Sequence, residues 1–122
     1  MATHYKELIV WQNAITLVKH IYRVTQAFPH IEVYGLVSQM RRAAVSIPSN
    51  IAEGQTRKTP VDFVRFLTMA HGSLAELETQ MIIARDLGYL PQEQFDECMA
   101  LHDEVSKMLV ALKTTISKTA TN

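Results

Sequence analysis

Apolar side chains recur along the chain at alternating spacings of three and four residues, which places them on one face of an α-helix. This pattern predicts four helices, at about residues 5–27, 33–54, 60–87 and 91–118. In the first helix, the face predicted to meet a core comprises Leu8, Trp11, Ile15, Val18, Tyr22 and Thr25. Pro29 follows this helix and indicates where it stops, because proline rarely continues a helix.

The second predicted helix contains a residue that disturbs regular helices, Pro48. Proline has no backbone N–H to donate to the carbonyl of Ala44, and its ring presses against the preceding turn. The sequence therefore predicts a kink or a break near Pro48. The apolar face of this helix comprises Leu36, Met40, Ala44, Ile47 and Ile51, and Gly54 stands where a C-cap is expected.

The third predicted helix has a clear start, because Thr59 can cap its N-terminus and Pro60 suits the first helical position. Its apolar face comprises Phe63, Leu67, Ala70, Leu74, Leu77, Met81 and Ala84. Gly88 marks its end. The fourth helix presents Phe95, Cys98, His102, Val105, Leu109, Leu112 and Ile116.

Four long helices with short connections pack most economically as antiparallel neighbours. We therefore expect residues 1–122 to form one all-α domain, an up-down-up-down left-handed four-helix bundle. Several apolar residues fall outside the predicted core faces: Leu17, Ile21, Val37, Val45, Phe66, Ile82, Ile83 and Met108. This surplus favours self-association over the alternative that isolated apolar side chains are normal on a protein surface.

Charge and composition narrow the function classes. Twelve Lys and Arg balance twelve Asp and Glu, so no global field directs the protein to nucleic acid or to anionic lipid. The charge is uneven: residues 1–65 carry eight cations and four acids, net +4, and residues 66–122 carry four and eight, net −4. With one cysteine, no signal-peptide pattern and no apolar run of membrane-spanning length, we expect a cytoplasmic protein that does not enter a membrane.

The sequence predicts no catalytic residue, metal site or cofactor. No Glu lies three residues before a His, as a di-iron bundle requires, and the four isolated glycines form no phosphate loop. His102 is expected to be a hydrogen-bonded residue of the core or an interface, and Cys98 a small buried hydrophobe. A bundle that binds a metal or small ligand through His102, Cys98 or Met residues of its core is an alternative.

Five cationic side chains gather around the end of the second helix, the next loop and the start of the third helix. They are Arg41, Arg42, Arg57, Lys58 and Arg65. As the densest cationic region of the chain, they form a candidate site for the phosphates of RNA or DNA. An ordinary solvated surface is the alternative.

A row of polar residues on the second helix faces a second row on the third helix. Arg42, Asn50, Glu53, Ser73 and Glu76 could together form a polar network inside a subunit contact. Arg42 would then require a carboxylate partner such as Glu53 or Glu76, because an unpaired charge is costly to desolvate. A solvated face is an equally good interpretation.

The segment 38–54, Ser-Gln-Met-Arg-Arg-Ala-Ala-Val-Ser-Ile-Pro-Ser-Asn-Ile-Ala-Glu-Gly, is distinctive. It resembles the bacterial four-helix bundle proteins encoded in intervening sequences of large-subunit ribosomal RNA genes. The resemblance covers almost the whole chain and includes Trp11-Gln12, Phe28-Pro29, Tyr34-Gly35-Leu36, the segments 63–67 and 72–79, and Leu87-Gly88-Tyr89.

The resemblance implies a four-helix bundle that assembles into a pentameric ring and has no known enzymatic activity. A similar fold serves as the accessory protein of diversity-generating retroelements, where a basic pentamer binds nucleic acid and a reverse transcriptase. This chain departs from that relative in its neutral charge. The leading hypothesis is a non-enzymatic homo-oligomer that binds RNA, DNA or a nucleic-acid-processing protein through the cationic patch, and the alternative is an adaptor that docks another protein's helix.

Overall fold

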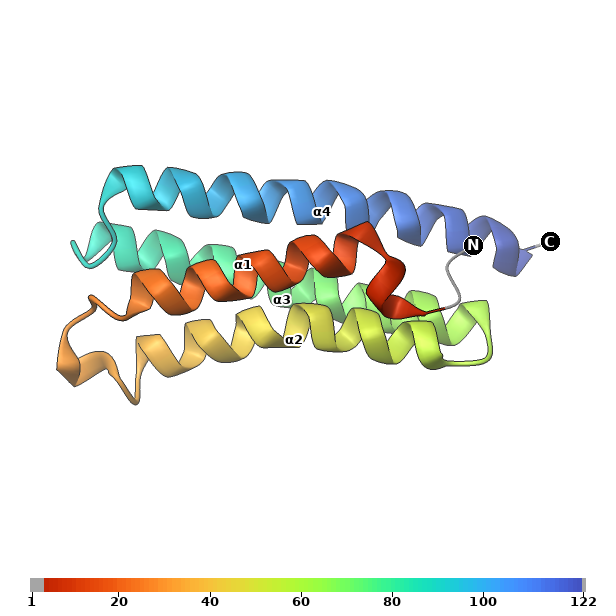
Figure 1. Ribbon diagram of the computed structural model, residues 1–122, viewed down its shortest axis with the longest axis horizontal. Helices are drawn as coiled ribbons and strands as arrows, with labels where there is room; N and C mark the ends of the chain where they lie inside the picture. Colours follow the sequence, from red (N-terminus) through yellow and green to blue (C-terminus); the bar gives the residue numbers. More distant parts are fainter. Residues whose placement is uncertain (1–3, 122) are drawn as a thin grey trace.

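The computed structural model describes residues 4–121, and every regular element in that range is helical. Its four long helices are α1 (Ile9–Thr25), α2 (Leu36–Thr56), α3 (Pro60–Asp86) and α4 (Gln92–Thr121). Two short 3-10 helices, η1 (Tyr5–Glu7) and η2 (His30–Glu32), precede α1 and α2. Figure 1 shows the long helices side by side, each antiparallel to the next. The predicted all-α four-helix bundle is confirmed, while its left-handed supercoil stays a prediction.

The four helices form a closed ring of neighbours. α1 contacts α2, α2 contacts α3, α3 contacts α4, and α4 returns to contact α1, with the most extensive contact between α2 and α3. The face built by α1 and α2 therefore lies opposite the face built by α3 and α4. Within residues 4–121, no helix is both long and apolar enough to cross a membrane.

The first helix differs from its predicted extent, 5–27. It begins at Ile9 because Leu8 is extended, at φ −74° and ψ 123°, and separates α1 from η1. The turn of η1 brings the ring of Tyr5 within 5.4 Å of the ring of Trp11, centroid to centroid. α1 then ends at Thr25, and the ends of α2, α3 and α4 lie within three residues of the predicted ends, with α3 beginning at Pro60 as predicted.

Helix α2 continues without interruption through Pro48, so the predicted alternative of a break is wrong. Pro48 is itself buried, and its neighbours Ala44, Ile47 and Ile51 are fully buried. Packing on both sides of the proline offsets the one backbone hydrogen bond that it cannot make. A local kink at this position stays a prediction.

The core face of α1 lies one residue away from the predicted face. The buried residues of α1 are Val10, Ala14, Leu17, Ile21, Val24 and Thr25, so of the predicted row only Thr25 is buried. A shift of one residue rotates the face by about 100° around the helix. The predicted core faces of α2, α3 and α4 are confirmed, except that Leu36, Phe63 and Leu112 are only partly buried.

The surplus of apolar residues predicted outside the core is smaller than expected. Leu17, Ile21, Val37 and Phe66 are buried in the fold. Val45, Ile82 and Ile83 are exposed, as the argument for self-association requires. The rotated face of α1 replaces the lost members of this set, because Trp11, Ile15, Val18 and Tyr22 now lie at or near the surface.

Candidate functional site

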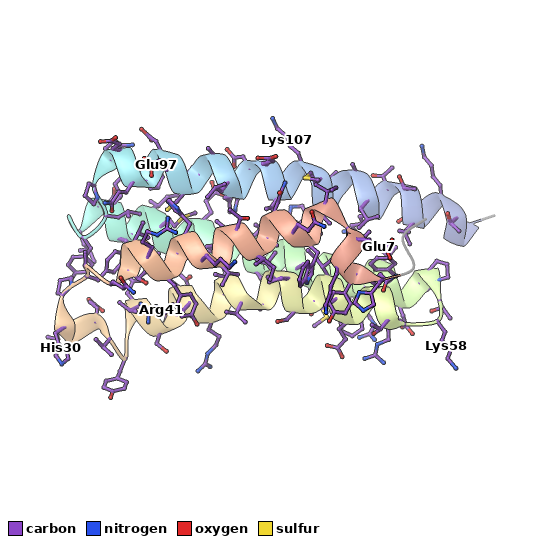
Figure 2. The ribbon with its side chains drawn as sticks, in the orientation of Figure 1. Glu7, His30, Arg41, Lys58, Glu97 and Lys107 are labelled. Carbon is purple, nitrogen blue, oxygen red and sulfur yellow. The ribbon has the colours of Figure 1, made fainter. Side chains whose placement is uncertain are left out.

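The five cationic residues of the predicted patch do not form one surface. Figure 2 shows Arg41 near one end of the bundle and Lys58 near the other. Because a helix rises about 1.5 Å per residue, the part of α2 between Arg41 and Arg57 is about 24 Å long. The patch therefore divides into a pair, Arg41 and Arg42, and a distant group of three.

The group of three is largely neutralised. Arg57 pairs with Glu53 at 2.9 Å, and Arg65 pairs with Asp62 at 3.5 Å. Both guanidinium groups also lie over the ring of Phe66, at 4.8 Å and 4.7 Å from its centroid. These two arginines therefore help to cover Phe66, which is 5% exposed. Lys58 lies in the turn between α2 and α3 and makes no ion pair with another described residue.

Arg41 is held against the end of α1. Its Nε atom donates to Thr25 Oγ1 at 3.0 Å, and its Nη2 atom donates to the carbonyl of Tyr22 at 3.3 Å. The guanidinium carbon lies 4.5 Å from the centroid of the Tyr22 ring. Arg41 thus joins the Thr25 hydroxyl in donating to one of the last carbonyls of α1, which have no backbone N–H partner within the helix. Its positive charge is fixed in place without a carboxylate.

Arg41 and Arg42 line a concavity of about 740 Å³ between α1, α2 and η2, which we call the Arg41 hollow. Other residues in its wall are Tyr22, His30, Tyr34 and Ser38. None of the twelve residues that line it in the described chain is acidic. Arg42 is exposed and makes no ion pair within residues 4–121. The hollow is therefore an electropositive site with aromatic walls.

Glu32 shapes the loop that closes the Arg41 hollow. Its Oε1 atom accepts from the backbone N–H of Leu36 at 3.2 Å, and its Oε2 atom accepts from the hydroxyl of Tyr89 at 3.0 Å. This hydrogen bond to a carboxylate raises the pKa of Tyr89. Gly35 permits the close approach, because a Cβ atom there would lie 2.8 Å from Glu32 Oε1. The loop presents Tyr34 to solvent, with 96% of its surface exposed.

An apolar groove continues from the Arg41 hollow toward η1, along the line where α1 meets α2. We call it the α1–α2 seam. It has a volume of about 290 Å³ and is lined mainly by Trp11, Ile15, Val18, Val45, Pro48 and Ala52. No charged residue of the described chain lines it. The row predicted to face the core of α1 faces this groove instead, and Val45 lines both the seam and the hollow.

The predicted polar network forms only in part. Ser73 meets Ser46, their hydroxyl groups in a hydrogen bond between α3 and α2, and Asn50 Nδ2 donates to the carbonyl of Ser46 at 2.8 Å. Glu53 pairs with Arg57 and not with Arg42. Arg42 and Glu76 make no ion pair with any residue in the described range. A role for these five residues in a subunit contact stays a prediction.

The residues considered for a metal or ligand site belong to the core. His102 is 5% exposed, with Nε2 2.8 Å from the carbonyl of Leu74 and Nδ1 3.1 Å from Asp103 Oδ1, which confirms a hydrogen-bonded core histidine. Burial raises the pKa of the Cys98 thiol to about 11, so it is not a reactive thiolate at neutral pH. Among residues 4–121, no group of three or more His, Cys, Asp and Glu could hold a metal ion.

Sequence reasoning found Arg41 and Arg42 but missed the other residues of the Arg41 hollow. The sequence pattern predicts Tyr22 for the core and no binding role for His30, and Tyr34 enters only through the family resemblance. The available signal was a large aromatic residue, Tyr34, directly before a glycine in a connection between two helices. Large apolar or aromatic side chains in such connections often serve binding.

The sequence profile of the 23S rRNA-intervening sequence protein family matches residues 6–111. Among solved structures, the chain is similar to a protein of unknown function from the S23 ribosomal protein family of Bacteroides thetaiotaomicron. That match has a TM-score of 0.78 at 20% sequence identity and covers 86% of this chain and 98% of the other. At this identity the likeness establishes the fold alone. A search of curated proteins finds no match.

Proposed function

Because the chain belongs to the family of 23S rRNA-intervening sequence proteins, we propose that it acts without catalysis, as a homo-oligomeric scaffold that binds nucleic acid. Five subunits in a ring is the assembly that the resemblance of segment 38–54 implies. The α1–α2 seam is the observation that carries the proposal of an oligomer, and the Arg41 hollow supports nucleic-acid binding.

The α1–α2 seam is a surface that a partner would stabilise. Trp11, Ile15 and Val18 remain only partly covered within one chain, and Val45 is 39% exposed. Each square ångström of such apolar surface removed from water contributes about 25 cal/mol. A continuous apolar groove without a charged lining residue differs from the isolated apolar side chains that any surface carries.

Charge complementarity favours a second copy of the chain as that partner. Residues 1–65, which include α1, α2 and the start of α3, carry net +4, and residues 66–122, which include most of α3 and all of α4, carry net −4. The acidic face also exposes apolar side chains, among them Ile82 on α3 and Val110 on α4. Docking the first face of one copy on the second face of the next is a head-to-tail contact, which closes into a ring when the rotation permits.

Light scattering coupled to size-exclusion chromatography tests the oligomer. We expect a mass close to five subunits for the natural chain at micromolar concentration, and a smaller assembly for Ile15→Glu, because the new carboxylate must lose water in the contact. Ile31→Glu is the matched control: Ile31 is 86% exposed in η2 and lines neither the seam nor the Arg41 hollow. Circular dichroism establishes that both variants are folded.

A monomer of the natural chain at tens of micromolar would overturn the oligomer. Equal dissociation by Ile15→Glu and Ile31→Glu would exclude the seam as the contact surface. A monomer that co-purifies with a helical partner would instead favour the protein adaptor.

A further inference from the structure

We propose that the Arg41 hollow is a binding site for single-stranded nucleic acid, in which the arginines hold phosphates and the tyrosines stack on bases. The inference rests on the proposed function and gives it a location: one end of the α1–α2 face, where Figure 2 places Arg41 and His30. The distant Arg57, Lys58 and Arg65 lie outside this site.

The charge of the hollow is available to a ligand. Arg42 is exposed and has no carboxylate partner among the described residues, and no acid lines the wall. Arg41 is oriented in advance by Thr25 and by the carbonyl of Tyr22, so fixing it on a ligand costs little conformational entropy. Arg57 and Arg65 have Glu53 and Asp62 as partners instead, and an anion would have to compete with those carboxylates.

The aromatic residues select among anions. Tyr34 exposes 96% of its surface and Tyr22 40%, in the wall of the same hollow. A free phosphate or an acidic peptide would satisfy the arginines and leave the Tyr34 ring in water. A nucleotide supplies a planar base for an aromatic ring and a phosphate for a guanidinium, and stacking contributes about 1–3 kcal/mol per base.

The geometry favours a single strand over a duplex. Bases in a duplex are stacked on each other and leave no face free for a tyrosine ring, whereas unpaired bases can turn out of the strand. RNA and DNA strands share the base and phosphate chemistry that the hollow recognises, and titration with both separates them. An assembly with one hollow per subunit would bind a long strand more tightly than one chain does.

Fluorescence anisotropy of the full-length protein with labelled single strands of RNA and DNA, and with the corresponding duplex, tests the site. We expect the single strands to bind more tightly than the duplex. Tyr34→Ala and Arg42→Ala should each weaken binding by about tenfold, the loss of one stacked base or one charge contact. Arg42→Ala should also reduce the dependence of log K on log[salt] by about one unit.

Lys58→Ala is the matched control for Arg42→Ala. Both changes remove one exposed cation that has no ion pair among the described residues, but Lys58 lies at the opposite end of the bundle. Affinity within twofold of the natural chain is expected for this control. Tyr34 and Arg42 are exposed, so we expect both variants to melt at the temperature of the natural protein.

The failures are distinguishable. Suppose that the natural chain binds single strands. If Arg42→Ala and Lys58→Ala then weaken binding equally, or if neither Tyr34→Ala nor Arg42→Ala weakens it, the hollow is not the binding site. The proposal that the protein binds nucleic acid would still stand. If the natural chain binds no strand and no duplex at low salt, nucleic-acid binding fails together with the hollow. Preference for the duplex, or equal affinity for a polyglutamate of the same charge, would overturn the aromatic part of the inference.

Discussion

The imidazole of His102 on α4 binds the backbone of α3, with its Nε2 atom 2.8 Å from the carbonyl oxygen of Leu74. A carbonyl oxygen only accepts, so Nε2 carries the hydrogen in this bond. The bond joins two antiparallel helices inside a largely apolar core, where Cys98, Val105 and Leu109 lie on the same face of α4. His102 therefore fixes the register of α4 against α3.

Replacing His102 tests this register bond. We expect His102→Leu to lower the free energy of unfolding by about 1–3 kcal/mol, because a buried hydrogen bond is lost and the Leu74 carbonyl loses a partner. Asp103→Asn is the control, since Asp103 is exposed and its removal leaves the bond to Leu74 intact. Urea unfolding of both variants provides the measurement, and equal stability of His102→Leu and the natural chain would contradict the assignment.

Helices α2 and α3 approach each other closely at Gly54. A Cβ atom there would lie 2.7 Å from Phe66 Cβ and 3.0 Å from Phe63 Cδ1. We expect Gly54→Ala to destabilise the protein by about 1–3 kcal/mol through overpacking. Gly72→Ala, in the middle of α3 with no atom within 4 Å of its new Cβ, should stabilise by about 0.5–1 kcal/mol through helix propensity. Thermal unfolding compares the two variants. A change in melting temperature of the same sign for both would refute the steric argument.

Alkaline pH should loosen the contact between η2 and the α3–α4 connection. The bond to Glu32 raises the pKa of Tyr89 above its usual value of 10.0, so the folded state keeps this proton longer than the unfolded state does. Its stabilising contribution is therefore complete below pH 10 and is lost as the pH rises through the raised pKa. We expect the melting temperature of Tyr89→Phe to fall less between pH 9 and pH 11, about one unit either side of that value, than that of the natural chain. An equal fall in melting temperature for the two proteins across this range would show that the ionisation of Tyr89 is not linked to folding.

The helices could be predicted from the sequence because their signals are local. Thr59 caps α3 through a bond from the backbone N–H of Asp62 to its side chain, as the Thr-Pro pair indicates. The face of α1 that packs in the core could not be predicted, because this helix has two adjacent apolar rows. The row of Trp11 and Tyr22 is larger, but the row of Leu17 and Ile21 faces the core. Periodicity gives the spacing of a face and not which of two faces packs inward.

The candidate site was harder to predict because it depends on contacts between distant segments. Arg41 and Arg57 lie within one short stretch of sequence, yet about 24 Å of α2 separates them. Conversely, Tyr22 and Arg41 come from different helices and are brought together by a hydrogen bond and by the position of η2. A charge cluster in sequence becomes a surface only when the chain folds back on itself.

Val45 lines both the α1–α2 seam and the Arg41 hollow, so two occupants of these surfaces would meet at one side chain. Thermodynamic linkage then makes their binding reciprocal: if a bound strand strengthens the contact between subunits by some factor, assembly strengthens strand binding by the same factor. If the strand and the neighbouring subunit instead clash at Val45, strand binding and assembly become antagonistic, and the bound strand would dissociate the ring. Measuring the mass of the assembly with and without a bound single strand therefore gives the sign and the size of this coupling.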